Sequence, residues 1–145
     1  MLGKDTKQTQ EDIKIFCEKI EAANTNKINE EFMIIARIES LILGKGMKDA
    51  VNRAINYIES GADGIMIHSK EKDGMEIIDF CNQYKSFNEK VPLVVVPSTF
   101  SHMTESQFKD LGISIVIYGN QLIRSAYPAM METAESILKH DRCKE

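Results

Sequence analysis

The sequence predicts an α/β fold in which one helix precedes four parallel strand–helix units. Four short apolar runs recur along the chain, at 32–37, 64–67, 93–96 and 113–118. Runs this short and this continuously apolar are typical of strands covered on both faces, as in parallel sheets. A segment with helical periodicity follows each run, and this alternation predicts strand–helix units in sequence.

The first predicted helix begins after a polar segment, residues 1–8, for which we expect a loop or a frayed end. Thr9 is the predicted N-cap, with Asp12 at the third helical position in an arrangement like a capping box. The apolar residues that follow have the spacing of an amphipathic helix, which we expect to end near Asn24: they are Ile13, Phe16, Cys17 and Ile20.

The first two strand–helix units have clear boundaries. The run Phe32–Ala36 forms the first predicted strand, and a glycine-bearing turn connects it to a helix over 47–60. Gly61 is suited to end that helix, because glycine adopts the left-handed conformation common after a helix C-terminus. The second strand is predicted at 64–67 and the next helix at 75–84.

The last two units are bounded by prolines and a polar cap. The strand at 93–96 has a proline just outside each end, where the missing N–H is tolerated. Thr104 is predicted to cap a short helix, which leads to the strand at 113–118. A long helix over 121–139 ends the chain, and Pro128 is expected to kink it or to split off its first turns.

Composition excludes several classes of protein. The net charge of −4 and the pI near 5.5 give no electrostatic signature of a nucleic-acid partner. No apolar run approaches the ~20 residues needed to cross a bilayer, and the polar N-terminal segment is unlike a signal peptide. The three cysteines lack Cys-x-x-Cys spacing, so we expect a reduced, cytoplasmic protein without a membrane partner.

Polar residues follow the predicted strands at the edge where parallel α/β proteins place their chemistry. Arg37 and His68 follow neighbouring strands, and a guanidinium beside an imidazole predicts an anion site. Either residue alone has a plainer interpretation, namely a salt-bridged strand end for Arg37 and a core or rim histidine for His68. Side chains at the same edge complete the predicted substrate-binding set: Glu39, Ser69 and Asn120.

The residues offer no complete catalytic machinery beyond this anion site. Ser69 and His68 are adjacent on an extended segment, so their side chains should point to opposite faces and not form a nucleophile–base pair. No pair of carboxylates has the spacing of metal ligands. We therefore predict anion binding without a metal site in this chain.

Four motifs give the sequence a resemblance to a known family. They are Ala36-Arg37-Ile38-Glu39, Met66-Ile67-His68-Ser69-Lys70, Val94-Val95-Val96-Pro97 and Val116-Ile117-Tyr118-Gly119-Asn120. In these, from about Thr9 to the C-terminus, the sequence resembles the phosphoenolpyruvate mutase and phosphonopyruvate hydrolase family of the isocitrate lyase superfamily.

The resemblance implies a fold and an activity. The family fold is a (β/α)8 TIM barrel, so residues 1–145 would form a single partial domain, the C-terminal half of such a barrel. Family members interconvert phosphoenolpyruvate and phosphonopyruvate in phosphonate biosynthesis, or hydrolyse the latter, with Mg2+. Arg37 and His68 would be catalytic, holding the phosphoryl and carboxylate groups of a three-carbon acid.

The resemblance also implies what the chain lacks. The family's Mg2+-anchoring acids and gating loop are expected upstream of this chain, so the 145 residues alone are predicted to be inactive. An unclosed half barrel exposes two strand edges and apolar surface. We therefore expect homo-oligomerisation or pairing with the missing half barrel.

The sequence also fits other functions. Phosphonopyruvate hydrolysis, or another C–C or P–C lyase reaction of the superfamily, is the nearest alternative to the mutase. A receiver- or flavodoxin-like module would suit the length and the alternation, although a receiver needs acidic residues where this chain has Arg37, His68 and Asn120. A non-catalytic α/β interaction module is the third possibility.

Overall fold

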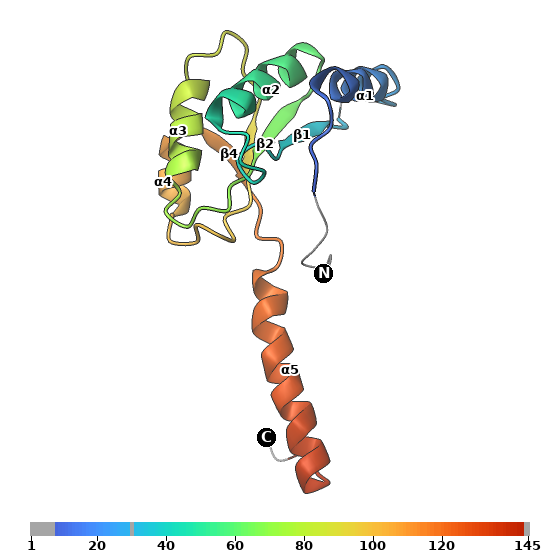
Figure 1. Ribbon diagram of the computed structural model, residues 1–145. Helices are drawn as coiled ribbons and strands as arrows, with labels where there is room; N and C mark the ends of the chain where they lie inside the picture. Colours follow the sequence, from blue (N-terminus) through green and yellow to red (C-terminus); the bar gives the residue numbers. More distant parts are fainter. Residues whose placement is uncertain (1–7, 30, 144–145) are drawn as a thin grey trace.

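The computed structural model describes residues 8–29 and 31–143, and within them a four-stranded parallel sheet (Figure 1). The strands follow each other across the sheet in the order of the sequence. They are β1 (Ile35–Ile38), β2 (Gly64–Ile67), β3 (Leu93–Val95) and β4 (Ile113–Val116). The predicted parallel, sequential arrangement is confirmed.

Five helices accompany the strands in the described part of the chain, one before β1 and one after each strand. They are α1 (Ile13–Thr25), α2 (Met47–Glu59), α3 (Met75–Tyr84), α4 (Glu105–Asp110) and α5 (Gln121–His140). The loop predicted at 1–8 lies outside the described residues except for Gln8, which has no regular structure. None of these helices is long and apolar enough to cross a membrane.

The helix ends show which capping signals operate. Helix α1 begins one turn later than predicted, because Asp12 and not Thr9 is its N-cap: the Asp12 side chain accepts hydrogen bonds from the backbone N–H groups of Lys14 (2.9 Å) and Ile15 (3.3 Å). Thr104 caps α4 as expected, in a capping box. Gly61 follows the C-cap of α2 with φ of 93°, a value that favours glycine.

Strand β1 lies further along the chain than the apolar run suggested. The prediction began at Phe32, but the strand begins at Ile35, and the Phe32 side chain is 63% exposed. The register explains the shift, because Ile35 pairs with Gly64, the first residue of β2. Residues before Ile35 have no β2 partner, and the strand continues to Ile38, so Arg37 lies inside the strand and not at its end.

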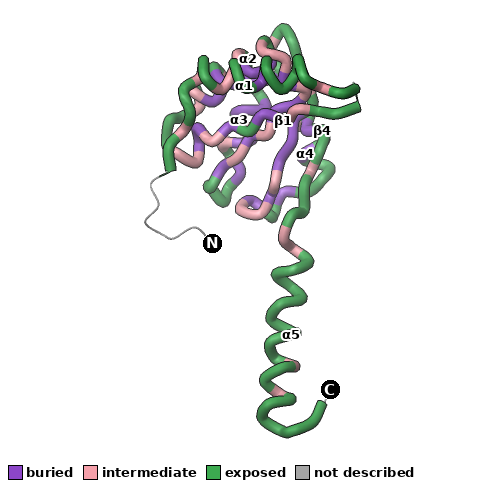
Figure 2. The backbone as a smooth tube through the Cα atoms, turned by 90° about the vertical axis from the view of Figure 1, so that its right-hand side faces the viewer, coloured by how far each residue is buried: buried purple, intermediate pink, exposed green. Residues whose placement is uncertain are grey.

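Burial separates the central strands from the edges (Figure 2). All three residues of β3 are buried, whereas buried and accessible residues alternate along β1 and exposed residues occupy the middle of β4. The expectation that the first strand is covered on both faces is therefore wrong, because the face that carries Ile35 and Arg37 stays accessible while Ala36 and Ile38 are buried. The core holds large side chains from helices and loops: Tyr57, Phe80, Phe100 and Phe108.

Helix α5 extends away from the rest of the molecule as a single rod (Figures 1 and 2). None of its residues is buried. It runs through Pro128 without a break, so the predicted splitting of its first turns is not observed. The carbonyl of Arg124, which would otherwise bond to residue 128, lies on an exposed helix where water can satisfy it, and this lowers the cost of the missing N–H.

Candidate functional site

The register of β1 and β2 brings the two predicted catalytic residues together. Arg37 pairs with Met66 and Ile38 pairs with Ile67, so the chain leaves both strands at the same level. Glu39 and His68 are the next residues along each strand. Three predicted site residues, Arg37, Glu39 and His68, therefore meet at the carboxyl edge of the sheet.

Direct contacts join these three side chains. The Arg37 guanidinium uses Nε to donate to Oε1 of Glu39, and its Nη2 lies 2.5 Å from Nδ1 of His68. The Nδ1 atom of His68 lies 3.7 Å from the same Glu39 oxygen. The side chains are 49% (Arg37), 30% (Glu39) and 25% (His68) exposed, so a ligand can reach the arginine.

The surroundings of His68 disfavour its charged form. Partial burial is the largest influence that lowers the pKa of His68, and the positive charge of Arg37 lowers it further. The Glu39 carboxylate acts in the opposite direction, but the net pKa is below the ordinary value for histidine. The imidazole is therefore predominantly neutral at pH 7.

Ser69 lies on the other side of the chain from this cluster. Its side chain is fully buried; the Oγ atom donates to Oε2 of Glu76 in α3 and accepts a hydrogen bond from the backbone N–H of Glu71 (3.0 Å). His68 and Ser69 point apart, as their adjacency predicted. Ser69 thus fixes the turn after β2 against α3, and its binding of a substrate stays a prediction.

Asn120 is not brought to the Arg37–His68 pair. It is the N-cap residue of α5 and follows β4, at the opposite edge of the sheet from β1. Three strand intervals separate β1 from β4, about 14 Å at the usual spacing of parallel strands. Its Oδ1 atom is buried without a hydrogen-bond partner, as is Oγ of Ser98 after β3.

A polar network that was not predicted from the sequence supports the turn after Glu39. Ser40 is fully buried; its Oγ donates to Oδ2 of Asp49 (2.7 Å) and accepts from the Gln10 side chain (3.0 Å). The same Asp49 oxygen accepts from Nε of Arg53 (3.0 Å), whose Nη1 donates to the Tyr57 hydroxyl (2.8 Å). The four-residue spacing of Asp49, Arg53 and Tyr57 was the available signal, because such residues share one face of a helix.

The described residues do not form a metal site by themselves. In residues 8–29 and 31–143, no group of three or more His, Cys, Asp or Glu side chains is arranged to hold an ion. The carboxylate within the candidate site, that of Glu39, is engaged by Arg37.

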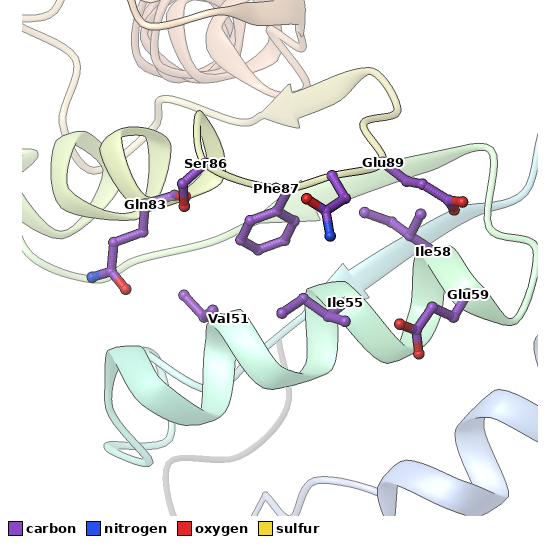
Figure 3. A pocket seen from close by; sticks show the side chains of 9 residues that line it. Val51, Ile55, Ile58, Glu59, Gln83, Ser86, Phe87 and Glu89 are labelled. Atoms are coloured by element: carbon purple, nitrogen blue, oxygen red, sulfur yellow. The ribbon is translucent and has the colours of Figure 1, made fainter.

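A hollow of about 440 Å³ lies elsewhere, between α2 and α3 (Figure 3). Val51, Ile55 and Phe87 give it an apolar floor, and Glu59, Gln83 and Glu89 lie at its rim. It is lined by α2 from Val51 to Glu59, by the end of α3 and by the loop that follows α3. Because those helices run back along the strands they follow, the hollow is at the opposite end of the molecule from Arg37 and His68 and is separate from the candidate site.

Four parallel strands, each followed by a helix, with polar side chains at the carboxyl edge of the sheet, have the architecture of part of a (β/α) barrel. The family model of phosphoenolpyruvate phosphomutase matches residues 2–138. The chain therefore belongs to the phosphoenolpyruvate phosphomutase family.

Characterised relatives place the chain within this family. It is 41% identical over 145 residues to the phosphonopyruvate hydrolase of Variovorax sp. strain Pal2, covering 99% of this chain and 49% of the relative. It is 32% identical over 137 residues to the phosphoenolpyruvate phosphomutase of Tetrahymena pyriformis, covering 94% of this chain and 45% of the relative. The chain thus spans about half the length of the relatives it matches.

Solved structures agree on the fold. A crystal structure of phosphonopyruvate hydrolase in complex with oxalate and Mg++ superimposes with a TM-score of 0.86 at 41% identity, over 99% of this chain and 50% of that one. The 2,3-dimethylmalate lyase structure, described as a member of the PEP mutase/isocitrate lyase superfamily, gives 0.76 at 20% identity over 97% and 48% of the two chains. The fold is half of the superfamily's TIM barrel.

Proposed function

We propose that this chain supplies the substrate-anion site of an enzyme that interconverts phosphoenolpyruvate and phosphonopyruvate. The observation that carries the proposal is the contact between Arg37 and His68 at the carboxyl edge of two adjacent strands. A guanidinium binds a phosphoryl or carboxylate group through paired N–H donors, and a neutral imidazole adds one directional hydrogen bond. Both would stabilise negative charge that moves during phosphoryl transfer.

The arginine retains donor capacity for such a ligand. A guanidinium carries five N–H donors, and the described contacts engage Nε with Glu39 and Nη2 with His68. Donors on the Nη atoms therefore remain for an anion. The substrate class that we propose is a phosphorylated or phosphonylated three-carbon acid.

Hydrolysis of phosphonopyruvate is the second candidate reaction. The identity of 41% to the Variovorax hydrolase, against 32% to the Tetrahymena mutase, favours it. Both reactions act on a P–C bond of the same acid and would use the same anion site. They differ in whether the phosphoryl group ends on the enol oxygen or on water.

Mg2+ is the proposed cofactor, with its ligands supplied by residues other than those described here. A relative's structure contains Mg++ with oxalate, and when bound the ion would neutralise part of the substrate's negative charge. The chain's own residues then bind and orient the anion.

We propose the cytoplasm as the location of the protein.

Completion by a further barrel half or by a second copy is proposed for the active assembly. The sheet ends at β1 on one side and at β4 on the other among the described residues, and unpaired edges favour association. Helix α5 adds an unpacked apolar face, on which Ile123, Tyr127, Met130, Ala134 and Ile137 recur at spacings of four and three residues.

A complementation experiment tests the proposed function. The chain is co-expressed with the half of the Variovorax hydrolase that it does not match, and the purified mixture is given phosphonopyruvate and Mg2+. Phosphorus NMR separates the outcomes, because phosphoenolpyruvate indicates the mutase and inorganic phosphate the hydrolase. A mixture with wild-type Arg37 and His68 that folds and associates, but converts phosphonopyruvate to neither product, would overturn the proposal.

A further inference from the structure

The contact between Arg37 and His68 determines where the imidazole can carry its proton. The guanidinium of Arg37 has only donors and stays charged at all ordinary pH values. Its Nη2 lies 2.5 Å from Nδ1 of His68. A proton on Nδ1 would set two N–H groups against each other, so Nδ1 must accept and the ring proton must lie on Nε2.

The charges around the ring favour the same protonation state. The charged groups that act on His68 are Arg37 and Glu39, both at the end of β1. The neighbouring end of β3, Val96 to Ser98, carries no titratable side chain. Burial and the arginine outweigh the carboxylate, and together they lower the pKa of the ring.

Glu39 is placed to orient the arginine more than to bind an anion. Its Oε1 accepts from Nε, on the stem side of the guanidinium, and leaves donors of the Nη atoms available. The network that starts at Ser40 holds the turn immediately after Glu39 against α2. A carboxylate in contact with an incoming phosphoryl group would repel it, so its useful position is behind the arginine.

We propose that Arg37, oriented by Glu39, holds His68 as a neutral imidazole protonated on Nε2, which makes the histidine a fixed hydrogen-bond donor to the bound anion. In this arrangement Glu39 is a positioning residue and not a substrate ligand. The identity of the anion rests on the proposed function; the protonation state does not. His68 then serves the site without adding a positive charge, and the arginine supplies the only full charge of the pair.

The nitrogen spectrum of the wild-type chain tests the protonation state directly. Long-range proton–nitrogen NMR on uniformly labelled protein distinguishes the two neutral forms of a histidine ring, and His68→Gln, His102→Gln and His140→Gln variants assign the three rings. We expect the His68 ring to be neutral at pH 7 with Nε2 protonated. A ring protonated on Nδ1, or an imidazolium at pH 7, would overturn the inference.

Two variants test the roles of the neighbours by opposite shifts. Arg37→Met removes the charge and the donor, so the pKa of His68 should rise and the preference for one neutral form should be lost. Glu39→Gln removes a carboxylate that favours the charged ring, so the pKa of His68 should fall. Shifts of the same sign in both variants would contradict the arrangement, with amide spectra of each variant showing whether the fold is retained.

Adding a ligand separates this inference from the proposed function. Phosphonopyruvate is titrated into the labelled wild-type chain, and into Glu39→Gln. Phosphonopyruvate should perturb the Nε2 signal of His68 in both proteins. Its affinity for Glu39→Gln should be equal to or weaker than its affinity for the wild type, because the arginine is then less well aligned. This result supports both the protonation state and the proposed function. The expected tautomer without any ligand response rejects the proposed function alone. The opposite result would be tighter phosphonopyruvate binding in Glu39→Gln than in the wild type. If this tighter binding were also found in the double variant Arg37→Lys/Glu39→Gln, it would show that Glu39 does not act through Arg37.

Discussion

At the scale of single residues, the site depends on the planar shape of one guanidinium. Arg37 contacts Glu39 through one nitrogen and His68 through another. Lysine would keep the charge but could not maintain both contacts, because its ammonium is a point charge on a flexible stem. Substitutions at Arg37 and His68 therefore separate the effect of charge from the effect of geometry.

We expect Arg37→Lys to lower the catalytic efficiency of the complemented enzyme on the order of 10²-fold, the low end for loss of one oxyanion-type donor. Arg37→Ala should be worse. His68→Asn keeps a donor near the same place and should be milder than His68→Ala. Steady-state kinetics followed by phosphorus NMR measures all four, and near wild-type kinetics for Arg37→Lys would reject the role given to Arg37.

At the scale of elements, one carboxylate fixes the start of β1. Asp63 precedes β2, and its Oδ2 accepts from the backbone N–H of Ile34 (2.7 Å) and lies 2.5 Å from Nζ of Lys27. Partial burial would raise the pKa of Asp63, but these two hydrogen bonds outweigh it and the net pKa is lowered. The interaction explains locally why the strand starts after Ile34.

Asp63→Asn should lower the free energy of unfolding by about 1 kcal/mol at pH 7, because its hydrogen bonds are no longer made to a charged acceptor and a hydrogen bond contributes an energy of this size. Because folding lowers the pKa of Asp63, the wild-type carboxylate stabilises the fold above its ordinary pKa, and this contribution is lost as the pH falls through the folded pKa. Urea unfolding should thus show the two proteins converging in acid.

Asp110 provides the control for that experiment, since it is an exposed aspartate at the end of α4. Asp110→Asn should change the free energy of unfolding little at either pH. A gap between wild type and Asp63→Asn that stays constant from neutral to acid pH would contradict the proposed charge effect.

At the scale of the whole molecule, α5 is the helix that has no buried residue in the described part of the chain. Its apolar face is exposed along five turns, and Met130 lies near its middle. Met130→Glu should weaken self-association on the order of tenfold or more, the cost of losing one buried apolar side chain. Ser125→Glu places the same charge on the opposite face and should have little effect.

Sedimentation equilibrium of the two variants and the wild-type chain measures this association. An entirely monomeric wild-type chain would remove the basis for a homo-oligomer formed through α5. Equal weakening by both glutamate substitutions would show that charge, and not the apolar face, controls assembly.

The isolated chain should have no measurable mutase or hydrolase activity. Phosphoryl transfer needs positive charge beyond one arginine, and the described residues form no metal site. Phosphonopyruvate and Mg2+ incubated with the chain alone should give phosphorus spectra identical to those of a buffer control. Turnover above that control would show that metal ligands within these 145 residues were missed.

The sequence by itself determined the elements, their parallel order and the pairing of Arg37 with His68. These features are local: strand and helix periodicity, caps at Thr104 and Gly61, and polar residues at the ends of two successive strands. In a sheet whose strands keep their sequence order, neighbours in sequence become neighbours in space. Two residues at the ends of such strands could therefore be brought together without knowing the structure.

Only the tertiary structure decided the start of β1, the hydrogen-bond partners of Ser69 and Glu39, and the exposure of α5. Each depends on a particular contact that periodicity does not specify: Gly64 sets the register of Ile35, Glu76 holds Ser69, and Arg37 engages Glu39. The apolar face of α5 was evident from its periodicity, but periodicity shows that a face needs a partner and not which surface provides it. The fold thus followed from local chemistry, whereas the detailed site depends on contacts between strands and helices.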